Sequence, residues 1–261
     1  MNRKKETAIK AMLFDLDGVL YVGNHMIPGA IESVCHIHNS GLPIAGLTNT
    51  TTQPKAAVAR KLAGFGIPIH ASDIYTPAAL AKQAIGDGCA KLYVRDSLLE
   101  DFQGIRTTDS NPDYIVMGDL GGEGYTPDLL HAIFNAVMDG ATVLALHKNR
   151  FWQKPDGLHL DIGPFVAAIE YATGTEATIL GKPSQDFFHG VCSALHVAPE
   201  SALMIGDDIE SDIGGAKDAG LETALVQTGK YREDFVRATG IKADLVLPSI
   251  ADLPDALKLL S

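Results

Sequence analysis

The sequence is poor in cysteine and has no long run of apolar residues. Its 261 residues include only three cysteines, and no two of them form a C-x-x-C pair. An odd number of widely spaced cysteines fits neither a disulfide framework nor a zinc site, so we expect reduced thiols. No apolar run approaches the ~18 residues that a membrane-spanning helix needs. The basic start is followed by an apolar stretch that an aspartate soon interrupts, which is not typical of a signal peptide. We therefore predict a cytoplasmic protein with no membrane partner.

Positive charge is also scarce. Lys and Arg number 21 against 32 Asp and Glu, which gives a formal net charge of −11. Nucleic acids and anionic membranes both require a basic footprint on the protein, so we expect no nucleic-acid partner. A site for an anionic small molecule must create its own local positive charge, which a metal ion would supply.

Short apolar segments alternate with longer segments of helical periodicity. Residues 9–16 and 43–49 are typical of buried strands, and residues 29–41 and 53–66 are typical of helices. This alternation predicts an α/β fold with a parallel sheet and helices on both of its faces. The remaining predicted elements are strands at 91–95, 113–120, 142–147, 202–206, 223–226 and 245–247, and helices at 126–140, 163–173 and 250–260.

Two carboxylates interrupt the first apolar strand. Asp15 ends the strand and Asp17 begins the loop in the stretch LFDLDGVLY. Ligands of open parallel sheets bind beyond the carboxyl ends of the strands. Alternation places both acids on one side if the chain stays extended. A single acid here is often a cap or a turn residue, whereas two acids followed by a glycine favour a site. An EF-hand loop is excluded, because its fifth and twelfth positions would be Val19 and Met26.

Two further polar segments follow predicted strands. Thr48 and Asn49 lie between a strand and a helix, where hydroxyl and N–H groups can bind an anion. An ordinary helix cap is the better explanation of these two residues taken alone. Lys182 lies between a short strand and a helix, which would suit a phosphate, although a lone lysine is usually a solvated surface charge.

The stretch MIGDDIESDIGG places several acids directly after a predicted strand. Asp207 and Asp208 end the strand, and Glu210 and Asp212 follow. So many like charges repel one another unless a cation lies among them. Short carboxylates are typical ligands of Mg²⁺. Acidic bias in the first turn of a helix explains Glu210 and Asp212, but not Asp207 at the strand end.

The order of these four motifs resembles the haloacid dehalogenase-like (HAD) superfamily. The motifs are D-x-D-G, Thr-Asn, Lys-Pro and G-D-D-x-x-x-D, and they span nearly the whole chain. Within the superfamily the chain resembles the NagD-like phosphatases. The stretches NPDYIVMGD and HKNRFW are most similar to the branch that contains phospholysine phosphohistidine inorganic pyrophosphate phosphatase. The resemblance implies a Rossmann-like parallel-sheet core at residues 1–76 and 180–261, with a smaller α/β cap domain inserted at residues 77–179.

The resemblance also implies the chemistry of a Mg²⁺-dependent phosphatase. Asp15 would be the nucleophile that forms an aspartyl-phosphate. Asp17 would protonate the leaving group and then activate water. Mg²⁺ would be bound by Asp15, by the backbone carbonyl of Asp17 and by Asp207, and it would offset the repulsion between the carboxylate and the phosphate.

The other motif residues would support this chemistry. The resemblance implies that Thr48, Asn49 and Lys182 hold the transferring phosphoryl group. Asp208 and Asp212 would orient the metal-bound waters or Lys182.

The substrate is expected to be a small phosphorylated molecule, which the cap would select. Asn149, Arg150 and Trp152 lie in HKNRFW after a predicted cap strand, and we expect them to overhang the substrate. Packing of Trp152 in the cap core explains that residue equally well. Two alternatives stay open: a phosphotransferase or phosphomutase with the same intermediate, and a non-catalytic receiver-like module phosphorylated on Asp15. The second is disfavoured by Asp17 and the cap. An apolar cap surface would support a homodimer.

Overall fold

The computed structural model describes residues 8–121, 124–154 and 157–258. The chain divides into two units. Unit 1 consists of Met1–Thr48, Ala56–Tyr75 and Lys182–Ser261, and unit 2 consists of Asn49–Lys55 and Thr76–Gly181. The segment Asn49–Lys55 is therefore grouped with unit 2, although it follows a strand of unit 1.

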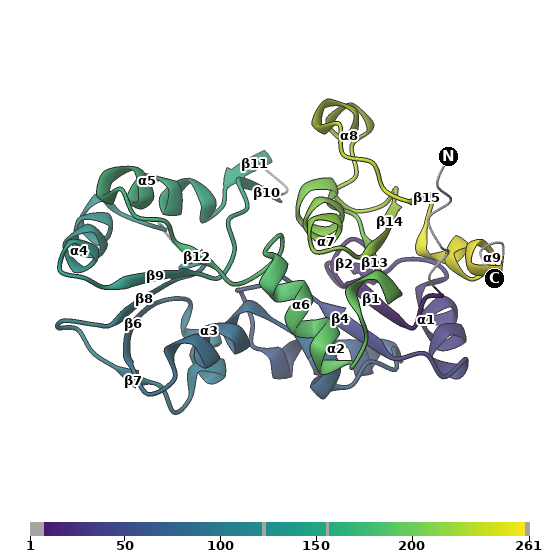
Figure 1. Ribbon diagram of the computed structural model, residues 1–261, viewed down its shortest axis with the longest axis horizontal. Helices are drawn as coiled ribbons and strands as arrows, with labels where there is room; N and C mark the ends of the chain where they lie inside the picture. The colour runs from purple at the N-terminus through teal and green to yellow at the C-terminus, as the bar shows by residue number, and fades with distance from the viewer. Residues whose placement is uncertain (1–7, 122–123, 155–156, 259–261) are drawn as a thin grey trace. The chain divides into compact units, whose positions relative to one another are not determined.

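Unit 1 contains a six-stranded parallel sheet with the strand order β15-β14-β13-β1-β4-β5 (Figure 1). From β1, the strands β4 and β5 are added toward one edge of the sheet, whereas β13, β14 and β15 are added toward the other edge. The strand order thus reverses between β1 and β13, which is where open parallel sheets bind their ligands. The strands are β1 Ala11–Asp15, β4 Ile44–Leu47, β5 Ile74–Tyr75, β13 Ala202–Gly206, β14 Glu222–Val226 and β15 Leu245–Leu247.

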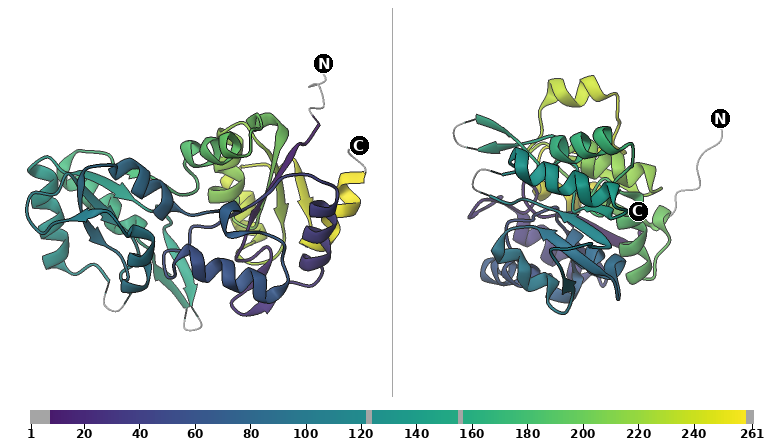
Figure 2. Two further views of the ribbon diagram at one scale, coloured as in Figure 1. Left: turned by 90° about the horizontal axis from the view of Figure 1, so that it is seen from below. Right: turned by 90° about the vertical axis from the view of Figure 1, so that its left-hand side faces the viewer.

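Helices cover both faces of this sheet (Figure 2). Met12 and Phe14 of β1 are buried in one cluster with residues of α1, α2 and α9. Leu225 of β14 instead packs against Ile209 and Ile213 in a second cluster. The helices and helical turns are α1 Ala30–Asn39, α2 Lys55–Phe65, η1 Ala71–Asp73, α6 Gln185–Ala194, η3 Pro199–Ser201, η4 Ile209–Gly214, α7 Gly215–Asp218, α8 Glu233–Thr239, η5 Ile250–Asp252 and α9 Leu253–Lys258. A hairpin of β2 Tyr21–Val22 and β3 His25–Met26 follows β1.

Unit 2 has its own five-stranded parallel sheet, with the strand order β12-β9-β8-β6-β7. Its helix α4 begins as the sequence predicts, because the Thr126 hydroxyl accepts a hydrogen bond from the Leu129 N–H. The strands are β6 Cys89–Tyr93, β7 Arg106–Thr107, β8 Tyr114–Met117, β9 Thr142–Ala145 and β12 Thr178–Ile179, with an antiparallel hairpin of β10 Phe151–Lys154 and β11 Gly157–Leu160. The helices are α3 Pro77–Ile85, η2 Asp96–Phe102, α4 Pro127–Met138 and α5 Gly163–Thr173.

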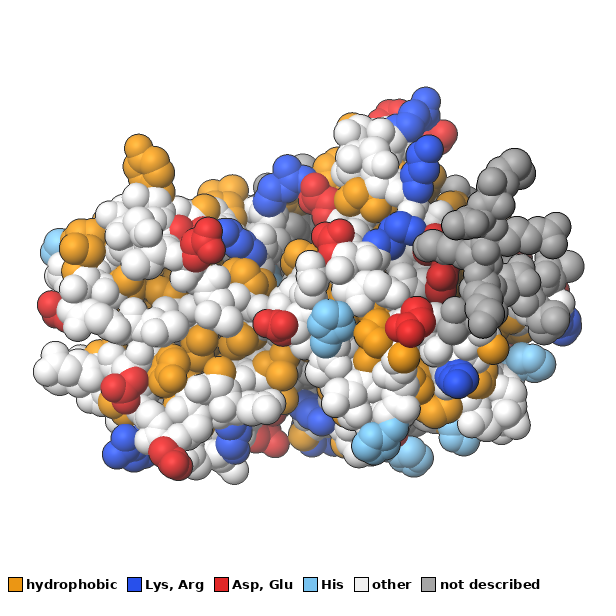
Figure 3. All heavy atoms as spheres, in the orientation of Figure 1, with side chains coloured by type: hydrophobic (Ala, Val, Ile, Leu, Met, Phe, Trp, Pro, Cys, Tyr) orange, Lys and Arg blue, Asp and Glu red, His pale blue; other side chains and the backbone are white. Residues whose placement is uncertain are grey.

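The apolar character of the helices and the charges on one face of the surface can be compared with the composition. Across the part of the chain that the structure describes, none of the helices combines the length and the apolar character that crossing a membrane requires. On the face shown in Figure 3, Lys and Arg side chains are interspersed with acidic ones and do not gather into one basic patch.

Asp244 ties the last strand of the unit 1 sheet to its neighbour. Its carboxylate accepts hydrogen bonds from the N–H and hydroxyl of the buried Thr223, at 3.0 and 2.6 Å, and from Lys217 Nζ at 2.8 Å. Partial burial raises the pKa of Asp244, but these donors outweigh it and lower the pKa overall. The carboxylate therefore stabilises the fold in its ionised form.

An Asp244→Ala variant is expected to lose about 1–2 kcal/mol of unfolding free energy at neutral pH, because two buried donors of Thr223 lose their acceptor. The partly exposed ion pair with Lys217 adds little. Since the folded-state pKa is lowered, the stabilisation is complete above the unfolded pKa and is lost as the pH falls below about 4. Urea unfolding at neutral and acidic pH measures the difference. Asp255→Ala, which breaks an exposed pair with Lys258, should change nothing measurable.

Candidate active site

Asp15 lies where the buried strand β1 ends, between its neighbours β13 and β4. The residue is only 7% exposed. The chain does not stay extended beyond it: Gly18 has φ +99° and its N–H bonds to the carbonyl of Tyr21 at 2.7 Å. Asp17 is exposed on this tight turn. The two aspartates therefore differ in exposure. The extended conformation on which the alternation argument depends ends with β1, so that argument does not place the side chain of Asp17.

Lys182 is a buried cation and not a surface charge. Its ammonium group donates to Asp15 Oδ1 and to Asp212 Oδ1, both at 2.6 Å, and the residue is 2% exposed. Burial disfavours the charge, but the two carboxylates outweigh it and raise the pKa of Lys182 above its ordinary value. A buried ion is tolerated only when it is paired in this way. Lys182 thus links the end of β1 to the helical turn η4.

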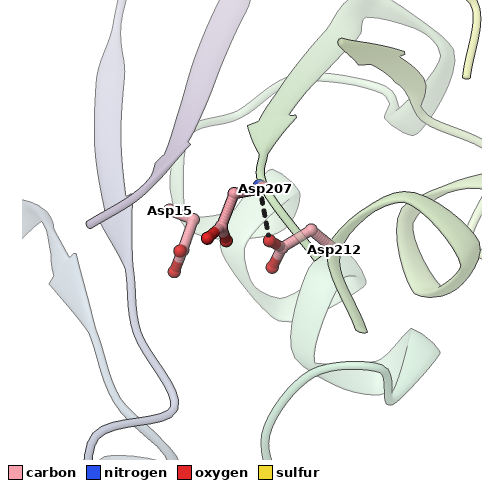
Figure 4. Close-up of side chains that lie close together, drawn as sticks. All are labelled: Asp15, Asp207 and Asp212. Carbon is pink, nitrogen blue, oxygen red and sulfur yellow. Dashed lines mark hydrogen bonds between the residues drawn. The ribbon is translucent and has the colours of Figure 1, made fainter. Parts of the chain in front are cut away.

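Three carboxylates lie close together at this edge of the sheet (Figure 4), and two of them accept hydrogen bonds from Lys182. Asp15, Asp207 and Asp212 are buried, and one oxygen from each lies within 4.8 Å of the others. Burial, followed by the charges of Asp15 and Asp212, raises the pKa of Asp207 well above its usual value. Burial also raises the pKa of Asp212 to about 6, although Lys182 opposes the rise. These raised pKa values reflect repulsion among carboxylates that a further cation would relieve.

The carboxylate oxygens of Asp212 and Asp207 differ in their hydrogen bonds. Asp212 Oδ2 accepts from the N–H groups of Asp207 and Asp208, at 3.2 and 3.1 Å, while its Oδ1 accepts from Lys182. Asp207 Oδ1, by contrast, is buried and has no hydrogen-bond partner among the described residues. An orphaned carboxylate oxygen beside two other acids fits a small divalent cation that prefers oxygen ligands, such as Mg²⁺. Asp212 is engaged as an anchor, which leaves Asp15 and Asp207 as the better ligands.

Asp208 shapes the turn that carries these acids. Its carboxylate accepts from the N–H groups of Glu210 and Ser211, both at 3.1 Å, and so caps η4. Lys230 Nζ lies 3.3 Å from its other oxygen. Burial would raise the pKa of Asp208, but Lys230 and the capping bonds lower it overall. Asp208 therefore stabilises the turn and pairs with Lys230. It does not belong to the group of three clustered carboxylates.

The remaining sequence-predicted residues belong to the end of β4 and to unit 2. Thr48 follows β4, is 4% exposed, and donates its N–H to the Tyr75 carbonyl. Asn49 belongs to unit 2. So do Asn149 and Arg150 before β10. Trp152 belongs to β10 and pairs with His159, but its side chain lies outside the described residues.

Sequence reasoning missed the loop after β14. The N–H of Lys230 donates to Asp207 Oδ2 at 2.6 Å, and the Thr228 hydroxyl donates to the Gly18 carbonyl at 2.5 Å. A signal was present, since Gly229 and Lys230 follow a predicted strand in VQTGK. Loops at the carboxyl ends of neighbouring parallel strands meet at one edge of the sheet, so this loop belongs to the same edge as Asp15 and Asp207.

Comparisons with known proteins agree with this geometry. The family model described as haloacid dehalogenase-like hydrolase matches residues 12–99, and the HAD-hydrolase-like model matches residues 179–253. The human haloacid dehalogenase-like hydrolase domain-containing protein 2 is 40% identical over 227 residues, which cover 86% of each chain. The human phospholysine phosphohistidine inorganic pyrophosphate phosphatase is 32% identical and covers 97% of this chain and 96% of its own.

Solved structures show the same architecture. NagD from E. coli K-12 is 28% identical, with a TM-score of 0.82 over 94% of this chain and 98% of that chain. The p-nitrophenyl phosphatase from Archaeoglobus fulgidus shares the fold, with a TM-score of 0.88 at 23% identity over 95% of this chain and 99% of that chain. The resemblance that the four motifs predict is thereby confirmed. The chain belongs to the haloacid dehalogenase-like hydrolases, and within them to the NagD-like phosphatases.

Proposed function

We propose that this phosphatase hydrolyses small phosphate compounds with Mg²⁺, through an aspartyl-phosphate on Asp15. The observation that carries the proposal is the buried group formed by Asp15, Asp207 and Asp212 around Lys182. Burial of three acidic side chains and one lysine costs folding free energy. A catalytic role therefore explains these residues better than a structural one.

In the first step, an Asp15 carboxylate oxygen attacks phosphorus while the bond to the leaving oxygen breaks. Lys182 holds Asp15 Oδ1, so Oδ2 is the oxygen that attacks. Thr48, Asn49 and Lys182 hold the phosphoryl oxygens and stabilise their charge. Mg²⁺, held by Asp15, the Asp17 backbone carbonyl and Asp207, would supply the positive charge that lets a carboxylate approach a phosphate dianion.

Asp17 moves the protons in both steps. It donates one to the leaving oxygen, and it then takes one from the water that attacks phosphorus and breaks the bond to Asp15. Its place on an exposed turn supports this role, since a proton shuttle must reach both the leaving group and water. Free phosphate and the Asp15 carboxylate are the products.

The names of the relatives suggest which substrate classes to test. One is named for phospholysine, phosphohistidine and inorganic pyrophosphate, and two structural neighbours are named p-nitrophenyl phosphatases. We therefore propose phosphate esters, phosphoramidates and pyrophosphate as the candidate substrates, and one compound of each class should be assayed. Asn149, Arg150 and Trp152 are proposed to contact the part of the substrate that is not transferred.

Metal removal and Asp17→Asn test the proposal. Hydrolysis of p-nitrophenyl phosphate should stop in EDTA and return with Mg²⁺. Asp17→Asn should still release one equivalent of p-nitrophenol in a burst, because this leaving group needs no proton. Steady turnover should then fall about 10²–10⁴-fold, because the intermediate lacks its base.

The intermediate itself is detected by mass spectrometry of the acid-quenched Asp17→Asn protein, with the phosphoryl group on Asp15. Full activity in EDTA would refute the metal requirement. Normal turnover of Asp17→Asn would refute the proton-transfer role. Phosphate passed to an added alcohol in place of water would favour the phosphotransferase.

A further inference from the structure

The loop after β14 contacts both the metal-site carboxylate and the turn that carries Asp17. We propose that Thr228, Gly229 and Lys230 form a positioning element that fixes Asp207 and the Asp17–Gly18 turn relative to each other. This inference rests on the proposed function of the same site. It concerns residues outside the four motifs, and it rests on hydrogen bonds and close packing within unit 1.

The first contact fixes one oxygen of Asp207. The N–H of Lys230 donates to Asp207 Oδ2 at 2.6 Å, while Oδ1 is buried without a partner among the residues that the structure describes. A short bond from a backbone N–H to a carboxylate is strong and directional. Lys230 therefore holds the carboxylate so that its other oxygen is presented to the cluster. The Lys230 ammonium group is exposed and pairs with Asp208, so the hydrogen bond that orients Asp207 comes from the Lys230 backbone.

The second contact fixes the turn beside the proton shuttle. The Thr228 hydroxyl donates to the Gly18 carbonyl at 2.5 Å, and the Gly18 N–H donates to the Tyr21 carbonyl at 2.7 Å. Both polar groups of the Gly18 backbone are thus bound, although the turn itself is exposed at Asp17. The hydroxyl of Thr228 therefore restrains the residue next to the one that transfers protons.

Gly229 allows the two contacts to exist together. Its φ is +56°, and a Cβ atom placed there would lie 2.0 Å from Asp207 Oδ2 and 2.5 Å from Gly18 Cα. A Cβ atom on Gly18 would lie 1.9 Å from the same Asp207 oxygen. The loop, the turn and the carboxylate consequently pack without space for one additional carbon, so any side chain at Gly229 must displace Asp207 or Gly18.

Gly229→Ala tests the metal side of the element. We expect the Mg²⁺ affinity of the free protein, measured by isothermal titration calorimetry, to fall about 10–100-fold, as it does when a residue that orients a metal ligand is lost. Gly240→Ala is the matched control. Gly240 also has positive φ, at +72°, but a Cβ atom there meets nothing within 4 Å. The Gly240→Ala protein should bind Mg²⁺ as the wild type does. A folded Gly229→Ala protein with wild-type affinity would overturn this half of the proposal.

Thr228→Val tests the proton-transfer side and does not depend on how well Gly229→Ala folds. Valine has nearly the same shape as threonine and carries a methyl group in place of the hydroxyl. We expect kcat for β-glycerophosphate, whose alkoxide leaving group needs a proton, to fall about tenfold more than kcat for p-nitrophenyl phosphate. Thr228→Ser retains the hydroxyl and should restore the ratio of the two rates. Equal losses on both substrates, or no loss, would overturn the role of Thr228.

The failure of this inference can be told apart from the failure of the proposed function. Asp207→Asn removes a proposed ligand, so it should abolish Mg²⁺ binding in the same titration. If Asp207→Asn binds Mg²⁺ as tightly as the wild type, the proposed metal site is wrong. If Asp207→Asn loses binding while Gly229→Ala keeps it, the metal site stands and the positioning role is wrong.

Discussion

An Asp15→Asn variant is expected to lose phosphatase activity about 10⁴-fold or more, because the covalent nucleophile is removed while the rest of the site remains. The amide oxygen can still accept the Lys182 hydrogen bond that Asp15 Oδ1 accepts at 2.6 Å. An amide does not attack phosphorus, so no intermediate should form. The measurement is the single-turnover release of p-nitrophenol with enzyme in excess over substrate.

The fold should tolerate this change, which separates catalysis from stability. Asp15 is one of three clustered carboxylates, and its charge helps to raise the pKa of Asp207 and Asp212. Removing that charge relieves repulsion in the absence of metal. We therefore expect an unfolding temperature equal to or above that of the wild type. Asp234→Asn changes an exposed acid outside the site and should keep full activity. A fully active Asp15→Asn protein would contradict the nucleophile.

The parallel sheet of unit 1 was predictable from local patterns. The predicted strands 202–206 and 245–247 have the bounds of β13 and β15, because apolar runs this short, bounded by turn residues, favour a strand over a helix. That the acids after β1 and β13 would share one site was implied by the family resemblance. The topology agrees with it, since the carboxyl ends of neighbouring parallel strands lie at one edge.

The hydrogen bonds of the site were not predictable, because they join residues far apart in the chain. Lys182 lies 167 positions after Asp15 and 30 before Asp212. Its place between a strand and a helix suggests a phosphate ligand, but only the family resemblance links it to Asp212, and nothing local shows that it is buried. The turn after Asp15 depends on Gly18, whose positive φ the sequence does not reveal. The β10–β11 hairpin was overlooked although Pro-Asp-Gly between two apolar stretches is a hairpin signal.

Loss of the Lys182 ammonium group is expected to lower both the stability of the fold and the activity. Lys182→Met keeps the length of the side chain and removes the ammonium group from between Asp15 and Asp212. In metal-free buffer at neutral pH we expect a loss of about 3–5 kcal/mol in unfolding free energy, because breaking a buried ion pair leaves uncompensated charges in the interior. Activity should fall as well, since the phosphoryl charge loses a donor. Lys258→Met, which removes an exposed lysine, is the control and should change neither quantity.

The pH dependence of this loss follows from the carboxylates that remain. Burial already raises the pKa of Asp212 to about 6, and Lys182 opposes that rise. Without the lysine the folded-state pKa rises further above its unfolded value, so protonation favours the folded variant. A group with a raised pKa adds stability at low pH and loses it as the pH increases. The gap between wild type and Lys182→Met in urea unfolding should therefore be widest at neutral pH and narrow under mildly acidic conditions. A gap that is constant with pH would mean that lost packing, and not unpaired charge, destabilises the variant.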